Sequence, residues 1–171
     1  MPVLTTPAEE TRYAELQLLA LDCARHGDTA TLAAMLRHGL PANLADPRGN
    51  TLLMLACYHG HAETARVLLD HGADVDRRNA RGQTPLGGAA FKGDEAVAAL
   101  LLERGADVDA DNGAGLTPIM FAAVFGRTGM VARLQAHGAS LRRRRRLGVP
   151  AAALIRLVGV VRRWLPGRRQ R

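Results

Sequence analysis

The sequence predicts an all-α solenoid of about four helix-turn-helix repeats, each 33 residues long, with short β-hairpin-like turns between them. The first observation is that glycines recur at this spacing in three interleaved series, a pattern that chance does not readily produce. The second is composition: 47% of the residues are hydrophobic but only 4% are aromatic, so the core must be built from Ala, Leu and Val, which pack short helices closely. The glycine series are Gly27, Gly60, Gly93, Gly126 and Gly159; Gly39, Gly72, Gly105 and Gly138; and Gly49, Gly82, Gly115 and Gly148.

Each glycine series predicts one feature of the repeat unit. The first falls where a first helix ends, the second where the next helix ends, and the third in a tight turn. All three places favour the left-handed backbone angles that glycine adopts without steric cost. Small pairs such as Ala89-Ala90 lie on the first helix and large triplets such as Leu100-Leu101-Leu102 on the second. Small residues facing large ones allow neighbouring helix pairs to nest.

One stretch of the chain contains a full set of these motifs in order. They are Asn79, Gly82, Thr84-Pro85-Leu86, Ala89-Ala90, Gly93, Leu101-Leu102 and Gly105-Ala106-Asp107-Val108-Asp109. This stretch resembles the ankyrin repeat, whose pattern is roughly D-x-x-G-x-T-P-L-H-x-A-A, then G, then L-L-x-x-G-A-D-V-N. The resemblance covers about residues 13–148. Because Met54, Gly87 and Met120 stand where the pattern has histidine, the hydrogen bonds that this histidine usually makes to the hairpin backbone must be supplied otherwise.

The period divides the chain into six parts. Residues 1–12 lead into a first helix, expected from about Pro7 to Arg25, because Thr6-Pro7-Ala8-Glu9 forms a capping box with proline at the first helical position. Residues 13–45 are an N-terminal cap repeat, whose second helix should run from about Thr29 to His38. Ankyrin repeats follow at 46–78, 79–111 and 112–147, the last with an arginine-rich turn.

Residues 148–171 are expected to form a degenerate fifth repeat, in which a basic amphipathic helix caps the stack and a short tail follows. A terminal repeat would otherwise expose its apolar stacking face. The apolar residues at helical spacing are Leu154, Leu157, Val158, Val161, Trp164 and Leu165.

Composition also indicates the surroundings of the protein. The two cysteines, Cys23 and Cys57, fit no zinc spacing, and such thiols suggest a reducing compartment and positions in the core. The N-terminus lacks the basic and apolar regions of a secretion signal, so we expect a cytoplasmic protein. Arginine far outnumbers lysine, whose single example is Lys92, and this bias suggests a bacterial source.

The charge of the chain is strongly divided. The first 140 residues hold 12 basic and 16 acidic side chains, whereas the last 31 hold 11 basic and no acidic ones. The basic segment could neutralise phosphates on nucleic acid or lie against an anionic membrane. It could equally solvate the cap, pair with the acidic repeats or continue a hairpin. The candidates for polyanion binding are Arg142, Arg143, Arg144, Arg145, Arg146, Arg162 and Arg163.

The resemblance to ankyrin repeats implies a partner-binding face on the hairpin tips and the exposed side of each first helix. Tyr58, Phe91 and Phe125 are three of only six aromatic residues and fall at positions that the framework does not require. Aromatic and arginine side chains often anchor interfaces. Alternatively, the aromatic rings could stack on one another across repeats, and the arginines could form a solvated surface. The candidates for protein binding are Arg48, Asn50, Tyr58, His59, Arg78, Arg81, Gln83, Phe91, Lys92, Leu116, Val124 and Phe125.

Catalysis finds little support in the sequence. It contains no GxxxxGK[ST], GxSxG or HExxH motif, and its single serine, Ser140, falls in a repeat turn. His59, His61 and Cys57 are close in sequence but lack the ligand spacing of a closed metal site. We therefore expect a monomeric binding protein with no catalytic residues, no metal and no cofactor.

Overall fold

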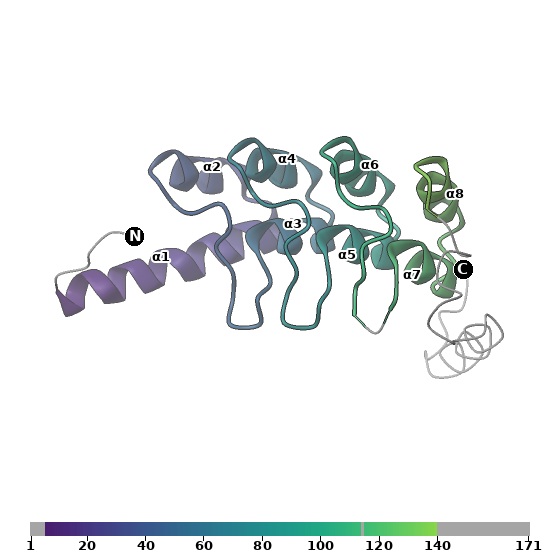
Figure 1. The fold of residues 1–171 in the computed structure, drawn as a ribbon. Coiled ribbons are helices and arrows are strands. Elements are labelled where there is room, and N and C mark those ends of the chain that lie inside the picture. The colour runs from purple at the N-terminus through teal and green to yellow at the C-terminus, as the bar shows by residue number, and fades with distance from the viewer. Residues whose placement is uncertain (1–5, 114, 140–171) are drawn as a thin grey trace, which may run out of the picture.

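The computed structural model describes residues 6–113 and 115–139, and within these ranges it has eight helices and no β-strand. The helices follow one another as four pairs (Figure 1). The prediction of an all-α repeat fold is therefore confirmed, whereas the expected capping helix in residues 148–171 lies outside the described residues. The helices are α1 (Pro7–His26), α2 (Thr29–Arg37), α3 (Leu52–His59), α4 (Ala62–Asp70), α5 (Pro85–Lys92), α6 (Glu95–Glu103), α7 (Pro118–Val124) and α8 (Thr128–Ala136).

The helices form two rows. The first helices of the pairs (α1, α3, α5 and α7) pack side by side in one row, and the second helices (α2, α4, α6 and α8) form another row against them (Figure 1). The chain returns from each second helix to the next first helix through a long hairpin loop, and the three loops project from the stack side by side. The first loop comprises residues 38–51, the second 71–84, and the third 104–113 and 115–117.

The glycines with a 33-residue period have the backbone conformation that their spacing predicts. Every member of the three series within the described residues has a positive φ, for example 76° at Gly27, 93° at Gly39 and 75° at Gly49. Gly27 ends α1 in the left-handed conformation, and its N–H donates to the Cys23 carbonyl. An L-residue with a side chain would be strained there, so glycine fixes the reversal between the two helices of a pair.

The start of α1 confirms the predicted capping box. The N–H of Glu9 donates to Thr6 Oγ1 at 3.3 Å, and the N–H of Thr6 donates to Glu9 Oε2 at 3.0 Å. Pro7 occupies the first turn, where its missing N–H costs no helical hydrogen bond. The ends of α1 and α2, at His26 and Arg37, each differ by one residue from the expected ends.

The core is aliphatic, as composition predicts. Small residues of the first helices, such as Ala56 and Ala89, and large residues of the second helices, such as Leu68 and Leu101, are completely buried. Both cysteines are buried and form no disulfide. Ala123 is exposed because no helix among the described residues follows α7 in its row.

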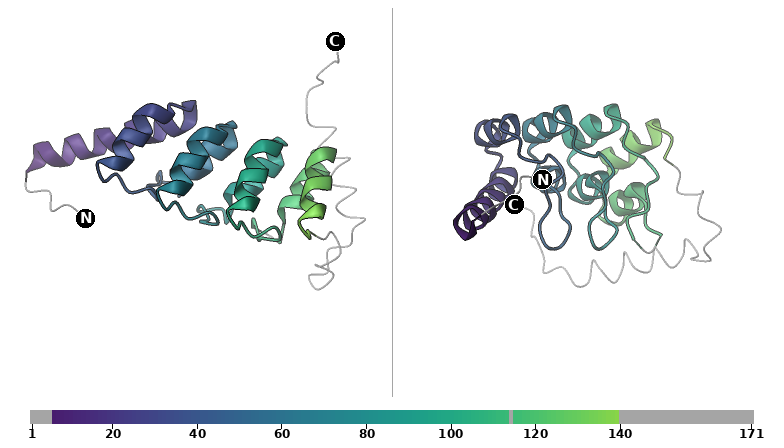
Figure 2. Two further views of the ribbon diagram at one scale, coloured as in Figure 1. Left: turned by 90° about the horizontal axis from the view of Figure 1, so that it is seen from above. Right: turned by 60° about the vertical axis from the view of Figure 1, so that its left-hand side comes forward.

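Helix α1 extends well beyond the stack at the N-terminal end (Figure 2). Its buried residues begin at Ala20, whereas Leu16, Leu18 and Leu19 are 42%, 64% and 48% exposed. Neither α1 nor any other helix in the described part of the chain is long and apolar enough to cross a membrane.

Candidate functional site

The hairpin loops and the first helices enclose a hollow of about 550 Å³, which we call the main hollow. Its walls come from α1, α3, α5 and α7 and from all three hairpin loops, so it spans neighbouring repeats. Of the twelve residues predicted to bind a protein, seven line it: Arg48, Asn50, Tyr58, His59, Arg81, Gln83 and Phe91.

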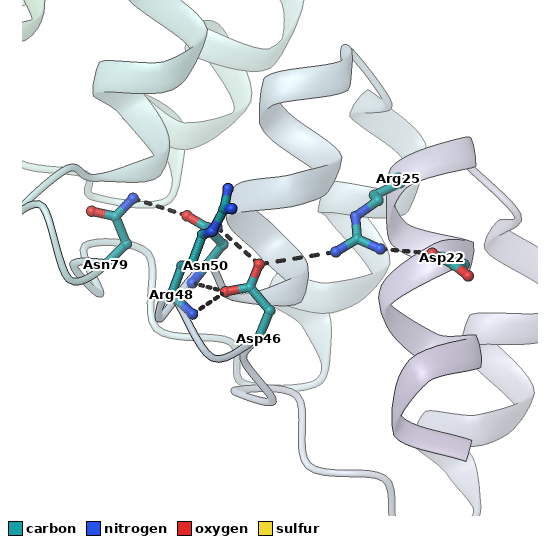
Figure 3. Close-up of polar contacts among 6 residues, drawn as sticks. All are labelled: Asp22, Arg25, Asp46, Arg48, Asn50 and Asn79. Atoms are coloured by element: carbon teal, nitrogen blue, oxygen red, sulfur yellow. Dashed lines mark hydrogen bonds and ion pairs between the residues drawn. The ribbon is translucent and has the colours of Figure 1, made fainter. Parts of the chain in front are cut away.

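The first hairpin loop is organised around the carboxylate of Asp46 (Figure 3). Asp46 Oδ1 accepts hydrogen bonds from the N–H groups of Arg48 and Asn50, both at 2.9 Å, and Oδ2 accepts from the Asn50 side chain at 2.9 Å. Arg25 of α1 lies 2.7 Å from Asp22 and 3.9 Å from Asp46. Burial alone would raise the pKa of Asp46, but these hydrogen bonds and the charge of Arg25 outweigh burial and lower the pKa.

The second hairpin loop repeats this arrangement with an amide. Asn79 Oδ1 accepts from the N–H groups of Arg81 and Gln83, both at 3.0 Å. Its Nδ2 donates to Asn50 Oδ1 at 2.9 Å and thereby links the second loop to the first (Figure 3). The backbones of the two loops are also joined, because Ala80 N–H donates to the Arg48 carbonyl at 3.0 Å. The polar wall of the main hollow is thus a continuous hydrogen-bonded ladder.

The third hairpin loop departs from this pattern. Here Asp111 accepts from the N–H groups of Gly113 and Gly115, while Asn112 turns inward. Asn112 Oδ1 accepts from the N–H and the hydroxyl of Thr84 at 2.7 and 2.9 Å, and its Nδ2 donates to the Ala110 carbonyl at 3.0 Å. Asn112 thereby ties the third loop to the start of α5, the helix in which Gly87 stands where the ankyrin pattern has histidine.

The aromatic side chains form a row along the first helices. The rings of Tyr58 and Phe91 are stacked, with centroids 6.2 Å apart and planes 13° from parallel. Phe125 meets Phe91 edge to face at 4.4 Å, and Lys92 Nζ lies 4.8 Å from the centre of the Tyr58 ring. The rings therefore contact one another across repeats, and partner contact stays a prediction; Tyr58 remains 40% exposed.

The charged groups that shift the pKa of His59 are all cationic. Burial lowers the pKa of His59, and the nearby charges of His61, Lys92, His26 and Arg25 lower it further. Asp46 is the one carboxylate among the described residues that line the main hollow, whereas Arg25, Arg48 and Arg81 are cationic. The main hollow therefore carries a local positive excess, although the first 140 residues are net acidic.

Five predicted binding residues lie outside the main hollow: Arg78, Lys92, Leu116, Val124 and Phe125. Phe125 belongs to the aromatic row, and Lys92 contacts this row at Tyr58. Arg78 is exposed; burial raises the pKa of Asp76, and the charge of Arg78 opposes this shift only in part. The seven arginines predicted to bind a polyanion, Arg142, Arg143, Arg144, Arg145, Arg146, Arg162 and Arg163, lie outside the described residues.

The sequence prediction of the site missed several residues that line the main hollow, including Asp46, Asn79, Asn112 and Phe121. Asp46 and Asn79 could have been found because each begins the loop motif that ends in Gly49 or Gly82. The inward turn of Asn112 has no comparable signal, because it depends on the space left by Gly87 on another element.

The histidines near the hollow have structural contacts. The ring nitrogen Nε2 of His61 lies 2.8 Å from the Arg25 carbonyl oxygen, within hydrogen-bond distance. The rings of His59 and His61 stack with centroids 6.3 Å apart. Within residues 6–113 and 115–139, no three His, Cys, Asp or Glu side chains gather in a way that could hold a metal ion.

Comparison with known proteins identifies the repeat. The family model of ankyrin repeats, which spans three copies, matches residues 20–112, more than half of the chain. The match begins within α1 and ends at Asn112, so it covers the residues that form the polar ladder. No curated protein matches the chain. The chain belongs to the ankyrin-repeat family.

Proposed function

We propose that the chain is a non-catalytic protein that binds another protein on its hairpin face, the surface made by the three hairpin loops and the exposed sides of α3, α5 and α7. Ankyrin repeats are in general protein–protein interaction modules, whose stacked units present extended binding surfaces. The main support is that Tyr58, although stacked on Phe91, is 40% exposed beside the main hollow. A partly exposed aromatic ring in a concave surface is typical of an interface anchor.

The hydrogen bonds within the hairpin face also favour binding. Asp46, Asn50 and Asn79 hold the first two loops by side-chain hydrogen bonds, and Asn112 holds the third loop to Thr84. Ordering a loop on binding reduces affinity, so a loop that is already ordered loses less on association. We further propose that the protein acts as a monomer in the cytoplasm of a bacterium, in line with its buried, unpaired cysteines and its arginine-rich composition.

Affinity capture tests this function. The full chain is immobilised and exposed to an extract of the cells that naturally produce it, in parallel with a Tyr58→Ala/Phe91→Ala variant. The matched control is Leu18→Ala/Leu19→Ala, which alters two exposed apolar residues on the projecting part of α1. We expect the wild type and the control to retain the same protein and the aromatic variant to lose it with unchanged helicity by circular dichroism. Equal retention by all three would contradict the proposal.

A second candidate function rests on charge. The last 31 residues hold 11 basic and no acidic side chains, so this segment could let the protein act as an adaptor on nucleic acid or an anionic membrane. The test is to titrate the full chain, and a chain that ends at Ser140, with duplex DNA and with vesicles containing anionic lipid at low and moderate salt. Binding by the full chain that weakens with salt and with truncation would support the adaptor. Absence of binding by the full chain would exclude it.

A further inference from the structure

The hairpin face contains a second, smaller hollow at the tips of the first two loops. Its volume is about 330 Å³, and it is lined by Pro47, Arg48, Asn50, Asn79, Arg81 and their neighbours Ala80 and Gln83. We call it the tip hollow. Arg48 and Arg81 also line the main hollow, so the two hollows are adjacent. Both arginines are exposed, and neither guanidinium forms an ion pair with a carboxylate in the part of the chain that the structure describes.

The acidic side chain nearest to Arg48 in sequence, Asp46, is already engaged. Asp46 accepts three hydrogen bonds from its own loop and lies within ion-pair distance of Arg25. Its side chain is only 11% exposed. The carboxylate of Asp46 is thus occupied by contacts within the protein. No carboxylate among the described residues lines the tip hollow. A ligand carboxylate could therefore bind Arg48 or Arg81 without displacing an internal ion pair.

Next to the arginines of the tip hollow, the main hollow provides an apolar surface. Phe91 is covered on one side by Tyr58 and met on the other by Phe125, which leaves an apolar row with Tyr58 at its accessible end. Because these rings already stack on one another, they are suited to packing against a side chain more than to stacking successive nucleic-acid bases. Lys92 beside Tyr58 adds a further positive charge.

We propose that the ligand of the hairpin face is an acidic peptide segment, whose carboxylates pair with Arg48 and Arg81 and whose aromatic or large aliphatic side chain packs on the row at Tyr58 and Phe91. This inference rests on the proposed function and specifies the class of partner. Bidentate pairing of arginine with a carboxylate supplies orientation as well as affinity. The lowered pKa of His59, caused by burial and by neighbouring cations, agrees with a positive surface that attracts such a segment.

Charge also argues against the basic end of the chain as the occupant of this face. Residues 141–171 carry 11 arginines and no acidic side chain, so they would place like charges beside Arg48 and Arg81. The face is therefore suited to a separate, oppositely charged protein.

A displayed library of random peptides tests the inference without knowledge of the natural partner. The full chain is the bait, and peptides are counted as dependent on the face when they bind the wild type but not Tyr58→Ala/Phe91→Ala. Both baits retain the basic segment 141–171, so peptides that bind only this segment are removed. We expect the remaining peptides to combine acidic residues with an aromatic or large aliphatic residue. Neutral or basic peptides would overturn this inference but leave the proposed function intact, whereas no face-dependent peptide at all would count against both.

Arginine variants then locate the acidic groups of the synthetic peptides. Arg48→Ala and Arg81→Ala should each raise the Kd about tenfold, and the wild-type Kd should rise with salt. Arg78→Ala is the matched control, because it removes the same charge from the second loop but lies outside both hollows. An equal loss of affinity in Arg78→Ala would overturn the inference in favour of general charge attraction. Displacement of the peptides by duplex DNA through Arg48 and Arg81 would overturn it in favour of a nucleic-acid site.

Discussion

The side-chain oxygen of Asn112 lies beside Gly87 in the space that a β-carbon at position 87 would occupy, and the three atoms nearest to that space all belong to Asn112. The two residues come from different elements, the third hairpin loop and α5. The asparagine reaches this place to accept hydrogen bonds from the N–H and hydroxyl of Thr84, which is itself buried. Glycine at 87 and asparagine at 112 therefore depend on each other.

The first prediction concerns this pair. Gly87→Ala should destabilise the wild type by about 1–3 kcal/mol, because the new methyl group displaces Asn112 from Thr84. In an Asn112→Ala background the same change should stabilise by about 0.5–1 kcal/mol, because alanine is the better helix former. Urea unfolding of the four proteins of the cycle measures both effects, and the sign of the Gly87→Ala effect should reverse.

Gly88 is the matched control for this cycle. A β-carbon there would lie 3.8 Å from Tyr58 Cδ2, an ordinary van der Waals contact. Gly88→Ala should therefore stabilise the protein in both backgrounds. If Gly87→Ala behaved in the same way in the wild type, the dependence of the two residues on each other would be refuted.

A second prediction concerns the acceptor at the base of the first hairpin loop. Asp46→Ala leaves the N–H groups of Arg48 and Asn50 without their acceptor and should cost about 1–3 kcal/mol. Asp46→Asn should cost less, because Asn79 makes the equivalent two backbone bonds in the second loop. Denaturant unfolding at neutral pH ranks the variants. Equal losses would show that the two loops are not held in the same way.

The lowered pKa of Asp46 adds a dependence on pH. The folded state favours the charged carboxylate, so its contribution to stability is full above the unfolded pKa and is lost as pH falls through the folded pKa. The stability advantage of the wild type over Asp46→Asn should accordingly shrink below about pH 4. A stability advantage that stayed constant across this pH range would contradict the lowered pKa of Asp46.

A third prediction concerns His59, whose lowered pKa means that the unfolded chain binds a proton more readily. Its contribution to stability is present above the unfolded pKa and is lost as pH falls through the range below about 6.5. Lys92→Ala should raise the pKa of His59 by removing a nearby positive charge, whereas Arg78→Ala should leave it unchanged. NMR titration of the His59 ring measures the pKa directly, and no change in Lys92→Ala would show that the charge of Lys92 does not contribute to the lowered pKa.

The C-terminal end of the stack gives a fourth prediction. Thr117 Oγ1 is buried and has no hydrogen-bond partner among the described residues, whereas the equivalent Thr84 hydroxyl donates to Asn112 in the following loop. We propose that residues 148–171 cap this end, so a chain that ends at Ser140 should melt at a lower temperature and aggregate more readily. An unchanged melting temperature, measured by calorimetry, would contradict the proposal that residues 148–171 cap the stack.

The fold could be predicted from the sequence because its signals are local and repeated. The left-handed conformation at Gly27 and its periodic equivalents requires glycine at a single position of the chain. The Thr6–Glu9 capping box spans only four residues. Such signals do not depend on distant contacts. The helix boundaries therefore agree to within one residue for α1 and α2.

The candidate site could be predicted only in part, because its geometry arises between repeats. The period placed Tyr58, Phe91 and Arg81 on one face, and they line the same hollow. The stacking of Tyr58 on Phe91 and the link from Asn79 to Asn50 depend on how adjacent repeats pack. Asn112 is the periodic equivalent of Asn79. The side chain of Asn79 accepts hydrogen bonds within its own hairpin loop, whereas that of Asn112 turns towards α5, where Gly87 leaves space for it.

The most direct test of the central claim, that the hairpin face binds a partner protein, is site-specific photo-crosslinking. A benzophenone amino acid is placed at position 83 on the hairpin face, and at position 18 on the projecting part of α1 as the control; both side chains are accessible to solvent at least in part. After irradiation in the natural cell extract, mass spectrometry identifies the attached protein. We predict that one protein is crosslinked from position 83 and not from position 18. Crosslinking of that protein from position 18 alone would contradict the account.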